Sequence, residues 1–271
     1  MFGGLYLFLA ELYAIRHSKR SRLTILAIIV GTFFAEGLSW YDTFIRFASG
    51  HLTTNQIPHP AMVAALSFSS SGQGIQMLLT LLLPVFLILI STGRTIERSS
   101  ASSNYPLYLK AGKLKRALLE SEWAQFRIVT LFFLLLYSSD FLIAVALFHG
   151  GENFRGLADQ PIGSSLLRWE LIHPYLTYVG TIIVVSVTFG IFSTVLHVLA
   201  LNLKRTGLIY LISMVIWLLL FSLPHGVAYF IQPFVGYNWH NRLLAMLSFG
   251  SVCGILILIG NLALNCRSRY W

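Results

Sequence analysis

The segment from Leu78 to Arg116 reads LLTLLLPVFLILISTGRTIERSSASSNYPLYLKAGKLKR. Its first half is an apolar run of the kind that crosses a lipid bilayer, and its second half carries charges, serines and a basic end. No polar stretch long enough to fold as a separate soluble domain follows it. A membrane span that leads directly into a polar segment predicts a docking element that a partner outside this chain recognises.

The composition places the chain among membrane proteins. Of its residues, 56% are hydrophobic and only 11% are charged, whereas about a quarter of a soluble domain is charged. The formal charge of +9 is more typical of loops that lie against anionic lipid than of nucleic-acid binding in so apolar a chain. Membrane lipid is therefore an expected partner and nucleic acid is not. Cys253 and Cys266 are too few for a disulfide framework and are expected to be free thiols.

The hydropathy pattern predicts one all-α transmembrane domain over residues 1–271, with six transmembrane helices. The expected spans cover about residues 23–44, 73–91, 126–148, 173–203, 208–223 and 243–264. Residues 2–16 are too short to span and predict an interfacial helix. Residues 92–122 predict a cytoplasmic segment that contains a coupling helix.

The three remaining connections are expected on the outer side. Residues 47–72 predict an outer loop with a short surface helix near 60–68, and residues 150–172 predict a second loop. Residues 224–241 predict either a third outer loop or a shallow re-entrant hairpin. Pro84 lies inside the second expected span and predicts a kink.

The distribution of basic residues predicts the orientation. Fifteen of the 19 Lys and Arg residues fall on one side of the expected bilayer, and only Arg46, Arg155, Arg168 and Arg242 fall on the other. Because cytoplasmic loops are enriched in Lys and Arg, both termini are expected in the cytoplasm. The chain is thus expected to be a multi-pass protein of the plasma membrane.

Two acidic residues lie deep in expected spans. Glu36 and Asp140 each lie about 20 Å from the inner surface at about 1.5 Å per residue, and a carboxylate at that depth is costly unless it is protonated, paired or hydrated. One interpretation is a polar wall or a contact for a cationic or amphipathic cargo. The alternatives are a hydrogen bond to a nearby Ser or Thr, such as Ser138 or Ser139 beside Asp140, or a position at the outer headgroups.

Two histidines raise a different possibility. His149 and His173 are expected at the outer ends of consecutive spans, and imidazole can ligate haem iron or copper. Lone histidines at a membrane interface are more commonly part of the aromatic belt. In the sixth span, Gly250 and Gly254 have the spacing of a close helix-packing face. No Ser/His/Asp or Cys/His spacing indicates nucleophilic catalysis.

Three stretches together resemble the permease subunits of type-2 ABC transporters. The first is Leu9-Ala10-Glu11-Leu12 with the basic turn that follows, which is similar to the family's interfacial helix. The second is residues 78–116, similar to its second span and coupling helix. The third is Asn202-Leu203-Lys204-Arg205 with the fifth span, the outer loop and the sixth span behind it. The family usually has a glycine where this chain has Ser102-Ser103-Asn104, which leaves the end of the coupling helix undefined.

The resemblance implies a function as well as a fold. Such permeases pair as homodimers or heterodimers, and each binds a separate ABC ATPase subunit. The coupling residues implied here are Arg94, Glu97, Arg98, Ser99, Ser100 and Tyr105. The chain lacks G-x-x-x-x-G-K-[ST], so ATP and Mg would be bound by the partner and the chain is not expected to be an enzyme by itself.

The expected activity is export of a hydrophobic or amphipathic substrate, such as a peptide, a drug or a lipid. Two other classes stay open at this point. One is a haem- or metal-binding redox protein that uses the outer histidines. The other is a membrane scaffold or immunity protein in which residues 94–116 recruit a partner without transport.

Overall fold

A computed structural model describes residues 3–46, 52–67, 71–93, 114–154, 157, 164–203 and 205–268. Apart from one isolated bridge between Pro58 and Asn153, the regular structure in these ranges is helical. The α-helices are α1 (Gly3–His17), α2 (Lys19–Tyr41), α3 (Pro60–Val63), α4 (Gln73–Leu81), α5 (Leu83–Leu87), α8 (Leu114–Leu147), α9 (Ser165–Ile172), α10 (Pro174–Leu203), α11 (Thr206–Ser222), α12 (Ala228–Ile231) and α13 (Trp239–Ser268). Three short elements complete the list: the π-helical turns η1 (Asp42–Arg46) and η3 (Ile88–Thr92), and the 3₁₀ turn η2 (Ala65–Ser67).

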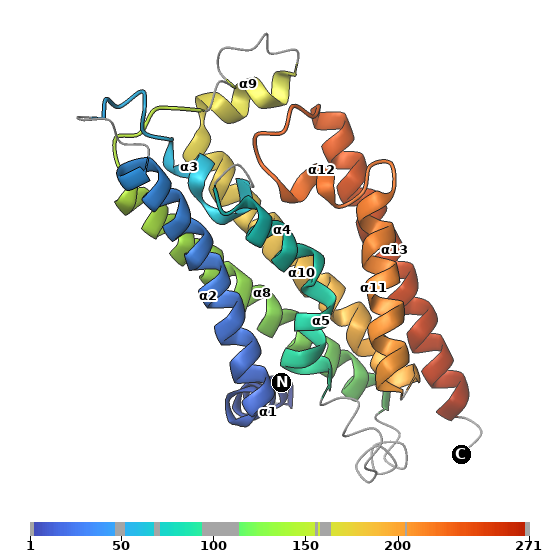
Figure 1. The fold of residues 1–271 in the computed structure, drawn as a ribbon. Helices are drawn as coiled ribbons and strands as arrows, with labels where there is room; N and C mark the ends of the chain where they lie inside the picture. Colours follow the sequence, from blue (N-terminus) through green and yellow to red (C-terminus); the bar gives the residue numbers. More distant parts are fainter. Residues whose placement is uncertain are drawn as a thin grey trace.

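The long helices run side by side between two ends of the molecule (Figure 1). Helix α1 and the last residues of α13 lie at one end, which we call the proximal end. The short helices α3, α9 and α12 lie at the other, which we call the distal end. Both described ends of the chain thus lie at the proximal end.

The number of membrane spans differs from the expected six. Four helices are long and apolar enough to cross a bilayer: Lys19–Arg46, Leu118–Leu147, Pro174–Leu203 and Trp239–Cys266. The bent pair α4–α5 makes a fifth if it is counted as one span. The span expected at 208–223 is wrong by this measure, because α11 has 17 residues and reaches about 25 Å, against about 30 Å of hydrocarbon. The chain is an all-α, multi-pass membrane protein with four to five candidate spans.

The kink expected at Pro84 is confirmed, and a distant side chain completes it. The axis of α4 differs by 59° from that of the helical segment Leu83–Thr92, which comprises α5 and η3. Pro84 has no N–H to donate to the carbonyl of Thr80, one turn earlier, so that oxygen loses its helical partner. The indole Nε1–H of the fully buried Trp217 in α11 donates to it instead, at 3.0 Å. A broken helix in a membrane is stable only where such groups are satisfied again.

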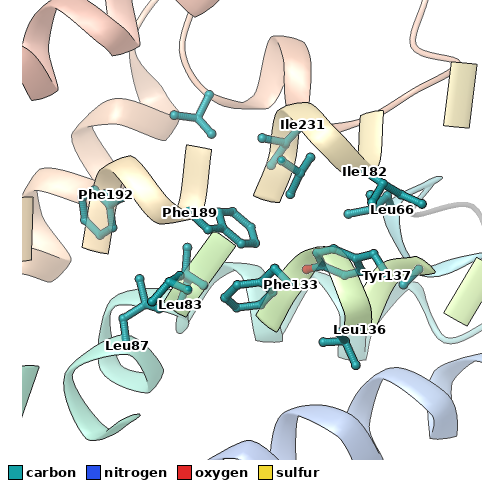
Figure 2. Packing of buried hydrophobic residues seen from close by; sticks show 14 of the residues in the cluster. Leu66, Leu83, Leu87, Phe133, Leu136, Tyr137, Ile182, Phe189, Phe192 and Ile231 are labelled. Carbon is teal, nitrogen blue, oxygen red and sulfur yellow. The ribbon is translucent and has the colours of Figure 1, made fainter. Parts of the chain in front are cut away.

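The centre of the bundle is the contact between α8 and α10. Phe133 and Tyr137 of α8 face Phe189 of α10 (Figure 2), with ring centroids of Phe133 and Phe189 4.8 Å apart. A Cβ at Gly190 would collide with Thr130 and Phe126, so this glycine allows the two helices to approach closely. Helix α8 starts at Leu114, so residues 114–122 of the segment expected to be cytoplasmic belong to the same helix as the third span.

The loop expected over residues 47–72 is also different. Residues 58–67 include the short helix that was expected, but every one of them is buried. We call residues 58–67 the wedge. It packs between α2, α8 and α10 at the distal end of the bundle. The segment 224–241 likewise contains the short helix α12, whose Phe230 and Ile231 are buried, so it resembles the re-entrant alternative more than a surface loop.

The close-packing face expected at Gly250 and Gly254 meets no other helix among the residues that the structure describes. Both are exposed, and a Cβ at either would meet open space. The close contact of α13 with α10 lies further along α13, at Gly260, where a Cβ would collide with Val198. There Asn202 Nδ2 donates to the carbonyl of Gly260 at 3.1 Å.

Candidate functional site at the intramembrane carboxylates

Glu36 lies in α2 on the face that packs into the bundle. Its neighbours on that face, Thr32, Ala35 and Ser39, are buried with it. The side chain is 1% exposed, and neither carboxylate oxygen has a hydrogen-bond partner among the described residues. The alternative of a headgroup position is therefore not supported, because the carboxylate is enclosed by protein. A buried carboxylate without partners is costly to maintain and requires an explanation.

Asp140 of α8 is fully buried, and α2 and α8, which carry the two carboxylates, both pack against the η2 turn of the wedge. Its Oδ2 accepts a hydrogen bond from the backbone N–H of Ala65, at 2.8 Å, while Oδ1 has no partner among the described residues. The expected bond to the adjacent Ser139 is absent, because that hydroxyl donates to the carbonyl of Leu136 instead. The structure thus brings the two predicted acidic residues to one place.

The wedge supplies backbone donors to this site. Next to the Ala65 bond, the N–H of Leu66 donates to the hydroxyl of Tyr178 in α10, at 2.9 Å. Helices α8 and α10 therefore each bring one polar side chain to the wedge, and both Asp140 and Tyr178 accept a hydrogen bond from its backbone.

The distal side of the wedge is fixed to the loop after α8. The N–H of His59 donates to the carbonyl of Asn153, at 2.9 Å, and the N–H of Asn153 donates to Ile57 at 3.1 Å. The ring of His59 caps α3 by accepting from the N–H of Ala61 and stacks on Phe154. Burial lowers the pKa of His59 to about 4, so the ring is neutral at physiological pH, as an accepting Nδ1 requires.

A second set of polar contacts holds the segment around α12 against the wedge. Gln232 donates to the carbonyl of Ser67 at 3.0 Å. Glu170 of α9 accepts from Arg242 at 2.5 Å and from the N–H of Phe234 at 2.9 Å. Burial raises the pKa of Glu170, and the charge of Arg242 acts in the opposite direction. Phe234 has a positive φ of 61°, a strained conformation that these contacts stabilise.

A small cavity lies one helical turn from each carboxylate towards the proximal end. It has a volume of about 20 Å³ and is lined partly by Thr32, Thr80 and Tyr137. A space of about 10–15 Å³ holds one water molecule when polar groups line it. Six of its nine lining residues are apolar, and the hydroxyls of Thr32 and Thr80 donate to the carbonyls of Ile28 and Gln76, so few polar groups remain in this cavity for a water.

The remaining predicted site residues lie elsewhere. The implied ATPase-coupling residues Arg94, Glu97, Arg98, Ser99, Ser100 and Tyr105 all fall outside the described residues. His149 and His173 are exposed, and the described residues contain no group of three or more His, Cys, Asp or Glu side chains that could hold a metal ion.

Comparison with known proteins adds one relative. No protein-family model and no solved structure matches the chain. The protein YybM of Bacillus subtilis (strain 168), described as uncharacterized, is 30% identical over 216 residues, which cover 79% of this chain and 84% of YybM. The chain belongs to the YybM family. This membership extends over most of the transmembrane domain and carries no assigned activity with it.

Sequence reasoning found the acidic pair of this YybM-family protein but not what surrounds it. The wedge was expected at the surface because Pro58, Pro60 and nearby serines are typical of loops. The available signal was the apolar stretch from Ala61 to Leu66, which is unusual for an exposed loop. Tyr178 and the pair of Glu170 with Arg242 have no local pattern, since their partners are 64 or more residues away.

Proposed function

We propose that this protein is the membrane subunit of an ATP-driven transporter in the plasma membrane, and that Glu36 and Asp140 line its substrate path. One observation carries the proposal: two buried carboxylates lie together inside the helical bundle, with three of their four oxygens unpartnered among the described residues. Ionisable groups inside a membrane are expensive, and they are characteristic of substrate and ion pathways.

The surrounding backbone favours transport over a purely structural role. Irregular backbone at membrane depth is tolerated where it is buried in protein or lines a cavity, and interrupted helices are typical of transporters. Here the break between α4 and α5 and the buried wedge are both near the acidic pair, which contacts the wedge through Asp140. A scaffold protein has no need for these costly features.

The remaining parts of the proposal come from the resemblance to type-2 ABC permeases. The protein would pair with a second copy or a paralogue, and a separate ABC ATPase would supply ATP and Mg. The polar segment with Arg94, Glu97 and Arg98 would receive the ATPase. The substrate would be hydrophobic or amphipathic, and a cationic group on it would complement the two carboxylates. Export is the direction typical of that family.

Two sets of variants in the full chain test the proposal. The protein is purified from native membranes with a terminal tag, and the copurifying proteins are screened for an ATPase with a Walker motif. The double variant Glu97→Ala/Arg98→Ala should lose that ATPase. Glu36→Gln should keep the ATPase but abolish transport of a cationic amphipathic dye in reconstituted vesicles.

The exposed Glu152 provides the matched control. Glu152→Gln should leave both ATPase association and transport unchanged. Absence of any Walker-type ATPase from the purified complex would contradict the ATP-driven part. Normal dye transport by both Glu36→Gln and Asp140→Asn would contradict the assignment of the substrate path.

A further inference from the structure

The acidic pair lacks a positive charge to balance it. In the described part of the chain, no Lys, Arg or His side chain pairs with Glu36 or Asp140. Among the described residues, the hydrogen bond that either carboxylate makes is the one that Asp140 accepts from the N–H of Ala65. Two ionised carboxylates that share a buried site repel each other and are poorly solvated, so they do not both remain charged. A bound cation is therefore needed.

The available ligands distinguish among possible cations. Asp140 Oδ2 is occupied by Ala65, and the Tyr178 hydroxyl accepts from Leu66. Within the described ranges, three carboxylate oxygens have no hydrogen-bond partner: both of Glu36 and Oδ1 of Asp140. Calcium takes about six to eight oxygen ligands and magnesium about six. Two N–H groups also point into the site, and these repel a metal ion. A proton needs only one oxygen.

We propose that Glu36 and Asp140 form a proton-binding site that holds at least one proton at neutral pH. The proton is bound to Glu36 or to Oδ1 of Asp140, which are the unpartnered oxygens. This site goes beyond the proposed transport function, since it belongs to the chain alone and does not require the ATPase.

The wedge links the proton to the conformation of the distal end. An ionised Asp140 makes a charge-assisted hydrogen bond to Ala65, and such bonds are stronger than neutral ones. When the first proton is on Glu36, a second proton on the pair neutralises Asp140 and weakens this contact. The wedge, which covers the pair towards the distal end, would then be held mainly by Tyr178 and by the loop at Asn153. Protonation and release of the wedge are therefore coupled.

Few other titratable groups face the pair. Tyr137 lies one turn before Asp140 on α8, and Tyr178 faces it from α10. From the wedge, His59 is turned towards Phe154 and Tyr175 rather than towards the carboxylates. Phenols do not titrate near neutral pH, and the buried distal carboxylate of Glu170 is paired with Arg242, so a carboxylic-acid signal that Glu36→Gln or Asp140→Asn removes belongs to the acidic pair.

Infrared spectroscopy of the purified full chain in lipid nanodiscs tests the proposal directly. Protonated carboxylic acids have a carbonyl stretch that ionised carboxylates lack, and it shifts in D₂O. At pH 7 the wild type should show this band. Glu36→Gln and Asp140→Asn should each weaken or remove it, while Glu152→Gln, an exposed acid at the distal end, should leave it unchanged. Gln and Asn keep the shape of the protonated acids, so both variants should fold.

The outcomes separate the alternatives. A band at pH 7 of the same intensity in Glu36→Gln, in Asp140→Asn and in the double variant would overturn the proposal. Loss of the wild-type band on replacing choline with sodium or potassium at constant ionic strength would overturn it in favour of an alkali-ion site. If a variant does not fold, titration of the wild-type band decides: a band that is absent at pH 7 and appears only in acid contradicts the proposal.

Discussion

Replacing Trp217 by Phe should show how the broken helix α4–α5 is stabilised. The indole of Trp217 is fully buried and its N–H donates to the carbonyl of Thr80 at 3.0 Å. Phe keeps an aromatic ring against Phe189 and Phe192 but has no donor. The Thr80 carbonyl then keeps only its contact with the N–H of Leu82, which also donates to Leu78, because Pro84 cannot donate to it.

The cost has two parts. Losing one hydrogen bond inside a membrane protein costs about 0.6–2 kcal/mol, and the smaller ring adds about 1 kcal/mol of lost packing, as for deletion of a buried methylene or two. Trp217→Phe should therefore lower the free energy of unfolding by about 2 kcal/mol. In a Pro84→Ala background the N–H of Ala can donate to Thr80, so only the packing part, about 1 kcal/mol, should remain.

The measurement is a double-mutant cycle on the purified protein in detergent, with unfolding by denaturant followed by circular dichroism. Trp123→Phe is the matched control, since Trp123 is 56% exposed and its replacement should change stability by no more than about 0.5 kcal/mol. The reasoning is refuted if Trp217→Phe costs the same with Pro84 as with Ala at that position. The Thr80 carbonyl would then not depend on the indole.

Three further predictions use thermal or chemical unfolding of the same purified protein. Arg242→Ala should destabilise it by about 3 kcal/mol because the buried Glu170 loses its charge partner, and adding Glu170→Gln should restore part of the loss; no recovery would contradict the pairing. Burial lowers the pKa of His59 to about 4, from about 6.5 in an unfolded chain. Between pH 4 and pH 6.5 the unfolded state therefore binds more protons than the folded state. The stability that the neutral His59 contributes is complete above about pH 6.5 and is lost as the pH falls to about 4. This contribution of His59 to stability is at most about 3 kcal/mol. His59→Asn, which can still cap α3, should flatten the dependence of stability on pH. An unchanged slope would exclude His59 as the source of that dependence. Gly190→Ala should cost about 1–3 kcal/mol by forcing α8 and α10 apart, while Gly250→Ala, with open space around it, should be neutral; equal effects would refute the close-packing argument.

The chain's composition and hydropathy were sufficient to predict much of the fold. Apolar runs longer than a bilayer is thick can only be helices there, because each backbone group must be satisfied within its own segment. The helices at 19–46, 174–203 and 239–266 follow from this rule. The kink at Pro84 follows from proline chemistry, because proline has no backbone N–H to donate within a helix. Glu36 and Asp140 were identified for the same reason: a charge inside an apolar run is conspicuous in the sequence.

Only the tertiary structure determined how those parts meet. The depth of the wedge depends on hydrogen bonds from Ala65 and Leu66 to side chains 75 and 112 residues away, and no local pattern encodes such a distance. The number of spans fell short of six because α11 is short and α4–α5 is bent, and the bend is completed by Trp217 from another helix. Local sequence specifies which groups a segment must satisfy, whereas packing among distant segments decides which partners satisfy them and which groups, such as the Glu36 carboxylate, stay unpartnered.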